Sequence, residues 1–366
     1  MSTPTPSPFL PPGRRRDRGR RRDRGRSARR RRRSAGWILL ALALPLAVVL
    51  AVAFAATRIV DSAGTGRPRS ATAATRDHTH HPGSARGRPA PGSGDAANTP
   101  ASPALLSLHF NHPPRAALLF DLDSGRVLWA INPGERLPIA SLAKMMTARL
   151  VVHSQHASAR VHITHNAVNA AGSKVGVLPV GKYVRLETLL YGLLLPSGND
   201  AAVALAEHVA GSVPRFVARM NDEARQLGLS CTRYVSPDGL EDANRSCAAD
   251  LATLARLDLD EPRIARVAST AATVQPLPIK GGRVWLYNNN PLLRFHYPGA
   301  IGLKTGETEA AGRCLVGAAR RGNVRLGVVL LGSPELGRQA EALLDRGFSG
   351  VYHLPPVAAP PVPKGL

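Results

Sequence analysis

The sequence predicts a mixed α/β domain of the α+β type, in which one antiparallel sheet is assembled from both ends of residues 105–354. Hairpin patterns, each with apolar runs on either side of a turn signal, lie near the two ends of this range. The stretch between them has apolar residues at helical spacing. Strands at both ends with helices between them favour a sheet into which a helical lobe is inserted.

The first hairpin is predicted over residues 116–132, "AALLFDLDSGRVLWAIN", with its turn at Asp123-Ser124-Gly125. The second covers residues 313–332, "RCLVGAARRGNVRLGVVLLG", and turns at Arg321-Gly322-Asn323. The segment before it, "AIGLKTGE", is predicted to form a further strand. Helical patterns fill the middle and close the domain, over residues 141–154, 186–211, 214–228, 247–259 and 335–348.

The formal net charge of +23 suggests a nucleic-acid-binding protein until it is mapped along the chain. Residues 1–34 contain 14 arginines against two aspartates, whereas residues 105–366 contain 28 basic and 20 acidic residues. The charge therefore belongs mainly to an N-terminal tail, and nucleic-acid binding is not expected of the domain.

The tail precedes "AGWILLALALPLAVVLAVAFAA", residues 35–56, which contains no charged residue and is long enough for a membrane-spanning helix. The arginines predict that the tail lies in the cytoplasm and the domain outside, anchored by this single span in the cytoplasmic membrane. The alternative is a cleaved secretory signal, since Ala53-Phe54-Ala55 resembles a cleavage site. The protein would then be secreted.

Residues 57–104 are rich in Gly, Pro, Ala and Ser without hydrophobic periodicity, and are predicted to be a disordered linker. Residues 355–366 are a Pro-rich tail. Cys231 and Cys247 flank a turn-rich stretch and are plausible disulfide partners in an oxidising exterior, with free buried thiols as the alternative. Cys314 lies in an apolar run and is expected to be buried.

Ser141 and Lys144 are three residues apart on a predicted helix, so their side chains share one face. Only six of the 48 basic residues are lysines, and Lys144 is one of them. Lysine can lose its proton inside a protein, whereas arginine in practice cannot. A deprotonated Lys144 could therefore accept the proton of the Ser141 hydroxyl and make it nucleophilic. A solvent-exposed surface lysine is the alternative.

Two further triplets strengthen this interpretation. Ser197-Gly198-Asn199 ends a strongly apolar helical pattern, and Lys304-Thr305-Gly306 lies on a predicted strand. In this order the three elements match the serine acyl-transfer signature of penicillin-binding proteins and class A β-lactamases.

Residues 115–348 resemble the low-molecular-mass D-alanyl-D-alanine carboxypeptidases, a family of serine peptidases. The resemblance extends beyond the three motifs to stretches such as "LETLLYGLLLPSGNDAAVALAEHVAG", "SPDGLED" and "AGRCLVGAARR". The chain departs from the family at Ala143, where threonine is usual, and at Cys247, where the family has Ser-Thr-Ala instead of Ser-Cys-Ala. The resemblance implies a penicillin-binding-protein or class A β-lactamase-like fold with a five-stranded antiparallel sheet.

The resemblance also implies the chemistry. The substrates would be peptidoglycan stem peptides, and β-lactams would be inhibitors. No metal or cofactor would be needed. The implied catalytic roles are Ser141 as acyl-ester nucleophile, Lys144 as proton acceptor, Ser197 as proton relay and Asn199 as hydrogen-bonding partner. Lys304 and Thr305 of the Lys304-Thr305-Gly306 strand would bind the substrate carboxylate. The backbone N–H groups of Ser141 and Glu307 would form the oxyanion hole.

Four other functions remain possible from the sequence. A class A β-lactamase is disfavoured because no E-x-x-L-N segment occurs and the middle motif is Ser-Gly-Asn rather than Ser-Asp-Asn. An endopeptidase that cuts peptidoglycan cross-links would have the same motifs. A transpeptidase is also left open. A non-catalytic penicillin-binding sensor is disfavoured because the serines and lysines are all present.

Overall fold

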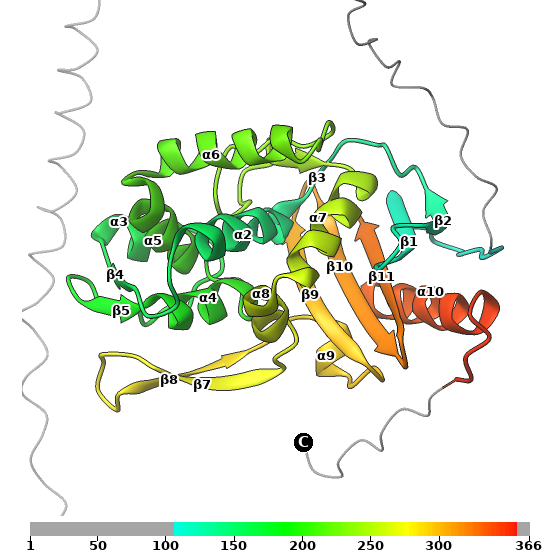
Figure 1. Ribbon diagram of the computed structural model, residues 1–366. Coiled ribbons are helices and arrows are strands. Elements are labelled where there is room, and N and C mark those ends of the chain that lie inside the picture. The colour runs from blue at the N-terminus through cyan, green and yellow to red at the C-terminus, as the bar shows by residue number, and fades with distance from the viewer. Residues whose placement is uncertain (1–105, 357–366) are drawn as a thin grey trace, which may run out of the picture. The chain divides into compact units, whose positions relative to one another are not determined.

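The computed structural model describes residues 106–356, and within them a five-stranded antiparallel sheet is the central element (Figure 1). The strand order is β2-β1-β11-β10-β9, so strands from the two ends of the domain lie side by side. The sheet and both predicted hairpins are therefore confirmed. The strands are β1 (Ala116–Asp121), β2 (Val127–Ile131), β9 (Ala300–Thr308), β10 (Gly312–Arg321) and β11 (Val324–Leu331).

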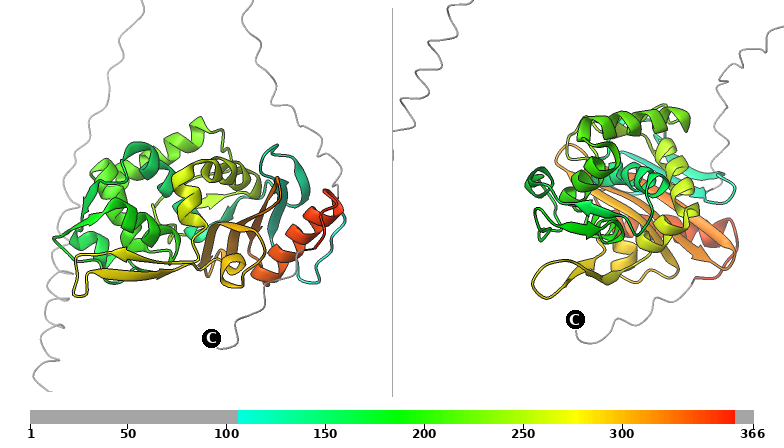
Figure 2. Two further views of the ribbon diagram at one scale, coloured as in Figure 1. Left: turned by 60° about the horizontal axis from the view of Figure 1, so that its bottom comes forward. Right: turned by 60° about the vertical axis from the view of Figure 1, so that its left-hand side comes forward.

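Both faces of the sheet are covered by helices (Figures 1 and 2). Alternate residues of one strand belong to two different hydrophobic cores. Leu118 packs with the helical lobe, whereas Leu119 packs with the C-terminal helix α10 (Leu336–Gly350). Because both faces are buried, β1 is apolar at nearly every position rather than alternating.

The helical lobe lies between β2 and β9 in the chain, as the sequence predicts. Its central helix is α2 (Lys144–Ser154), which follows a short 3₁₀ helix, η1 (Ala140–Ala143). The other helices are α3 (His165–Asn169), α4 (Leu186–Leu194), α5 (Asn199–Ala210), α6 (Val213–Gln226), α7 (Ala248–Asp260), α8 (Pro262–Ala268) and α9 (Pro291–Arg294).

The helical pattern over residues 186–211 forms two helices, α4 and α5, rather than one. Pro196 follows the end of α4, and because proline has no backbone N–H it cannot donate the next hydrogen bond of the helix. Ser197 then adopts a left-handed conformation with φ of 66° before α5 begins. The break places Ser197 in the connection between two buried helices.

Small two-stranded sheets complete the lobe. The largest is a ribbon of β7 (Ala272–Pro276) and β8 (Arg283–Tyr287), which the sequence analysis missed (Figure 1). The ribbon turns at Gly281 and Gly282, both with positive φ. The remaining strands are β3 (Leu137–Pro138), paired with β6 (Arg245–Ser246), and β4 (Arg160–His162), paired with β5 (Tyr183–Arg185).

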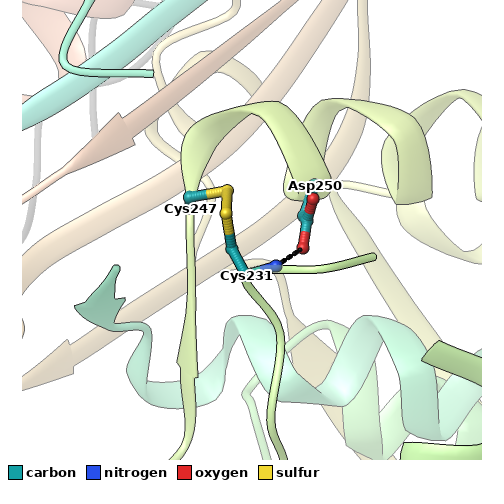
Figure 3. A group of neighbouring side chains, drawn as sticks. All are labelled: Cys231, Cys247 and Asp250. Carbon is teal, nitrogen blue, oxygen red and sulfur yellow. Dashed lines mark hydrogen bonds between the residues drawn. A yellow bond between two sulfur atoms is a disulfide. The ribbon is translucent and has the colours of Figure 1, made fainter. Parts of the chain in front are cut away.

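Cys231 and Cys247 form a disulfide with a Cα–Cα distance of 5.6 Å (Figure 3). Asp250, in the first turn of α7, accepts hydrogen bonds from the Cys231 N–H at 2.8 Å and from the Thr232 hydroxyl at 2.7 Å. Cys231, Cys247 and Asp250 lie close enough together to hold a metal ion, but the two sulfur atoms are bonded to each other. The cluster therefore fastens the loop before β6 to the start of α7. Cys314 is buried.

The arginine-rich tail, the predicted membrane span over residues 35–56 and the predicted linker over residues 57–104 lie outside the described residues. Among the helices within residues 106–356, none combines the length and the apolar character that crossing a bilayer requires.

Candidate active site

Ser141 and Lys144 lie next to each other at the junction of η1 and α2. The Lys144 ammonium nitrogen is 2.9 Å from the Ser141 hydroxyl oxygen. Ala140, just before the serine, has a left-handed backbone with φ of 48°, and its carbonyl packs against Gly239. A Cβ atom at Gly239 would lie 2.0 Å from the Ala140 oxygen, so this contact requires glycine. The turn that presents Ser141 is thus supported by a segment nearly 100 residues away in the chain.

Lys144 is fully buried and has two further hydrogen-bond partners. Its Nζ lies 2.7 Å from the Asn199 Oδ1 and 2.7 Å from the Asp238 carbonyl oxygen. Burial lowers the pKa of Lys144 from 10.5 to about 7, although the negative charges of Asp238 and Asp200 oppose this shift. Both protonation states are therefore accessible near neutral pH.

The three contacts fit a neutral amine that accepts a proton from Ser141. The amide oxygen of Asn199 and the carbonyl of Asp238 can only accept hydrogen bonds. A neutral amine would use its two N–H bonds on these two acceptors. Its lone pair would then point at the Ser141 hydroxyl, which is the arrangement that a general base needs.

Ser197 and Asn199 come from the break between α4 and α5, and Asn199 contacts Lys144. Asn199 accepts from Lys144 through its oxygen and donates through its Nδ2 to the Ala171 carbonyl at 2.6 Å. This second bond fixes which way the amide faces. The Ser197 hydroxyl oxygen is buried and has no hydrogen-bond partner among residues 106–356. A buried hydroxyl without a hydrogen bond lowers the stability of the folded state, and such groups are typical of functional sites.

The loop of residues 171–176 is tied to the start of α5. The Asn199 N–H donates to the Ser173 carbonyl at 2.7 Å. Both oxygens of the Asp200 carboxylate accept backbone N–H groups of this loop, from Val175 and Gly176, at 2.9 Å each. Asp200 is not among the sequence-predicted site residues, and its position directly after the Ser-Gly-Asn triplet was the signal that could have identified it.

Lys304 and Gly306 point from β9 toward the helical lobe, because they pair with Val316 and Cys314 of the lobe-side core. Lys304 is 1% exposed, and its Nζ donates to the Thr305 carbonyl at 2.8 Å. Burial, and to a lesser extent the charge of Lys144, holds the pKa of Lys304 well below its usual range. Lys304 therefore lies beneath the site surface.

Gly306 allows β9 to approach Ser141 closely. A Cβ atom at this position would lie 2.9 Å from the backbone nitrogen of Ser141 and 3.0 Å from the Ile139 carbonyl oxygen. Such separations are too short for any side chain. The glycine of the Lys-Thr-Gly triplet is thus explained by the packing of β9 against η1.

The N–H of Glu307 points outward from β9, which is an edge strand of the five-stranded sheet. On β10, the carbonyl of Arg313 accepts from the Ser333 N–H at 2.8 Å, on the side of β11. Arg313 and Glu307 face each other across the strands, so they are a pair that exchanges no hydrogen bonds. The Glu307 N–H is consequently free to face a ligand, close to the backbone of Ser141.

A cavity of about 290 Å³ lies over these groups. Its lining contains Ser141, Ser197, Thr305, Gly306 and Glu307, whereas Lys144, Asn199 and Lys304 lie behind it. The structure therefore brings all eight sequence-predicted catalytic and binding residues together, in one layer at the cavity and one beneath it. The lining residues that the sequence analysis missed are Ser173, Asn289, Arg294, Arg313 and Leu336.

Comparisons with known proteins agree with this geometry. A family model described as D-alanyl-D-alanine carboxypeptidase matches residues 101–335. The carboxypeptidase DacF of Bacillus subtilis is 35% identical over 247 residues, which are 65% of this chain and 63% of the relative. A D-alanyl-D-alanine carboxypeptidase of Mycobacterium tuberculosis is 37% identical over 246 residues, 65% of this chain and 83% of the relative.

Solved structures show the same fold. The crystal structure of a D-alanyl-D-alanine carboxypeptidase from Mycobacterium tuberculosis has a TM-score of 0.61 at 34% identity, covering 68% of this chain and 95% of that one. A variant of a Streptomyces DD-transpeptidase has a TM-score of 0.61 at 32% identity and covers 66% of this chain and all of that one. The predicted penicillin-binding-protein fold is therefore confirmed.

Proposed function

Because the chain belongs to the D-alanyl-D-alanine carboxypeptidase family of serine peptidases, we propose that it removes the terminal D-alanine from peptidoglycan stem peptides through an acyl-enzyme on Ser141. The observation that supports this most directly is the 2.9 Å contact between the Ser141 hydroxyl and the buried amine of Lys144. The pKa of about 7 leaves that amine neutral in a large fraction of molecules at neutral pH.

In the first step, the Ser141 oxygen attacks the carbonyl carbon of the penultimate D-alanine while Lys144 takes the hydroxyl proton. The negative charge that develops on the carbonyl oxygen is stabilised by the N–H groups of Ser141 and Glu307. The C–N bond then breaks, and the proton passes through the Ser197 hydroxyl to the leaving amine. The unpaired state of the Ser197 oxygen is consistent with a group that gains a partner only when substrate is bound.

Thr305 faces the cavity and is placed to bind the terminal carboxylate of the substrate. Lys304 supports the site from beneath, as a buried amine that donates to the Thr305 carbonyl. Asn199 keeps Lys144 aimed at Ser141 through its fixed amide. Water finally hydrolyses the ester and regenerates Ser141.

β-Lactams, which contain a carbonyl and a carboxylate in similar positions, are expected to acylate Ser141 and to leave it slowly. The chain has no E-x-x-L-N segment, which class A β-lactamases use for deacylation. Inhibition rather than hydrolysis is the expected outcome.

Residues 35–56 are proposed to anchor the chain in the cytoplasmic membrane, with the domain on the outer side. The support for this is the uncharged stretch itself and the 14 arginines that precede it.

A second candidate activity is transfer of the acyl group to an amine of another stem peptide, or the reverse cleavage of a cross-link. It is favoured by the likeness to a protein described as a DD-transpeptidase at 32% identity. The nucleophile and base would be the same, and only the group on the leaving side would differ.

The test measures D-alanine release from a peptide ending in Lys-D-Ala-D-Ala by the full chain in detergent. Ser141→Ala should abolish release and also prevent a penicillin adduct in the intact-mass spectrum. Ser230→Ala is the matched control, because Ser230 is exposed and lies outside the cavity lining, and it should keep most of the activity. Release that persists in Ser141→Ala would refute the proposal.

A further inference from the structure

Two arginines line the cavity that also contains Ser141. Arg294 is the last residue of α9, and Arg313 is the second residue of β10. Both are exposed, and neither side chain makes an ion pair or a hydrogen bond with the residues that the structure describes. Two charged groups are therefore available to a ligand in this cavity.

The arginines and the nucleophile lie on different sides of β9. Gly306 faces Ser141 on the lobe side. Thr305 pairs with Leu315, which belongs to the core beneath α10, so Thr305 points toward the α10 side. Arg313 lies across from Glu307 on that same side. The cavity thus passes around the free edge of β9.

The arginine end is the leaving-group end. The proposed mechanism places the substrate's terminal carboxylate at Thr305, which lines the same cavity as Arg294, Arg313 and Leu336 and faces the α10 side of β9 as Arg313 does. Leu336 is the first residue of α10, so the positive end of this helix lies at the same place. All three features favour negative charge.

The charges on the cavity surface can be compared directly. Arg294 and Arg313 are the cationic lining residues, and Glu307 is the acidic one. Lys304 is 1% exposed and is not part of the lining. A guanidinium stays protonated and binds a carboxylate with two parallel hydrogen bonds, so one arginine is enough for one carboxylate. Two arginines can bind two carboxylates.

We propose that Arg294 and Arg313 form a leaving-group subsite that binds a second carboxylate, beyond the one at Thr305. The preferred substrates are then stem peptides whose leaving group is itself an acidic peptide, as in a cross-linked dimer, rather than D-alanine alone. This inference rests on the proposed function, because it assumes the acyl transfer at Ser141.

The experiment compares three synthetic peptides that share the same acyl part and end in D-Ala-D-Ala, D-Ala-D-Gln or D-Ala-D-Glu. The last two leaving groups are nearly identical in shape and differ by one negative charge. The full chain is assayed together with Arg294→Gln, Arg313→Gln and the double variant. Arg320→Gln is the matched control, because Arg320 is exposed on the same strand as Arg313 but does not line the cavity.

The unmodified enzyme should cleave the D-Glu peptide with a kcat/KM about tenfold above that of the D-Gln peptide, mainly through a lower KM. The double variant should lose this preference, and each single variant should lose part of it. Arg320→Gln should keep it, and high salt should weaken it only in enzymes that retain the two arginines.

Equal rates on the D-Gln and D-Glu peptides would overturn the subsite, as would a preference that survives in the double variant. An equal loss on all three peptides in the double variant would also overturn it, since the arginines would then bind only the shared terminal carboxylate. Failure of the proposed function is distinguishable, because the unmodified enzyme would then release nothing from any peptide and Ser141 would not be acylated by penicillin.

Discussion

Replacing Asn199 with aspartate should move the pH dependence of acylation to higher pH. In the proposed mechanism, Lys144 must be neutral to accept the Ser141 proton, and its pKa is about 7. Acylation should therefore rise with pH through about 7 and level off above it. Asn199→Asp keeps the size and shape of the side chain but places a carboxylate at the position now 2.7 Å from the Lys144 nitrogen.

The expected magnitude follows from this distance. An adjacent opposite charge favours the protonated amine and raises a pKa by roughly 1–3 units. The midpoint of the acylation profile should then lie at about 8–10. At pH 7 the neutral fraction of Lys144, and with it the acylation rate, should fall roughly fivefold to several hundredfold. The rate should recover as the pH is raised.

The assay is the rate of acylation by a fluorescent penicillin between pH 5.5 and 10, with short reaction times at high pH. Asn199→Leu is the matched control, because it also loses the hydrogen bond to the Ala171 carbonyl but adds no charge. Its midpoint should stay well below that of the aspartate variant. An unmoved midpoint in Asn199→Asp, or an unmodified enzyme whose rate is flat through pH 7, would refute Lys144 as the base.

Two further predictions concern a single hydroxyl and the disulfide. Ser197→Ala should lower D-alanine release by about 10²–10⁴-fold without lowering Tm, because the Ser197 oxygen has no partner to lose among the described residues; a clear drop in Tm, or full activity, would contradict the relay role. Removing the disulfide with Cys231→Ala and Cys247→Ala should lower the free energy of unfolding by about 3 kcal/mol, for a separation of 16 residues, and Tm by roughly 6–12 °C. Scanning fluorimetry with and without reductant checks this, since reductant should destabilise only the unmodified protein.

The sequence predicted the elements whose patterns are local and long. The hairpins near Gly125 and Gly322 and most helices were found because apolar periodicity and turn residues agree there. The ribbon over residues 272–287 was missed, although residues 283–287 alternate between exposed and buried positions and follow a Gly-Gly pair. The available signal was the run of β-branched and aromatic residues after the Gly-Gly pair. Because exposed Trp285 and Tyr287 are apolar like their buried neighbours, the sequence itself does not alternate between apolar and polar residues.

The sequence predicted the parts of the candidate site that are formed by side chains. It did not predict the parts that are formed by the backbone. Ser141, Lys144 and Asn199 were identified by residue type and order. The third partner of Lys144 is the carbonyl of Asp238, and every residue has such a carbonyl. The left-handed backbone of Ser197 likewise has no signal in a non-glycine residue. Arg294 and Arg313 line the cavity because of how α9 and β10 pack in the fold. Nothing in the local sequence around either arginine indicates this packing.

The pairing of β1 with β11 has a consequence for the order in which the protein is made. Ala116 lies opposite Leu331, so the sheet cannot close until nearly the whole domain has left the ribosome. A half-synthesised chain already contains Ser141 and Lys144 but lacks β9, whose Gly306 packs against the nucleophile. Such distant pairing also slows folding, because the ends must meet across a long chain. The complete candidate site therefore forms only once the final strands are in place. A truncated chain that lacks these strands is expected to be inactive toward peptides.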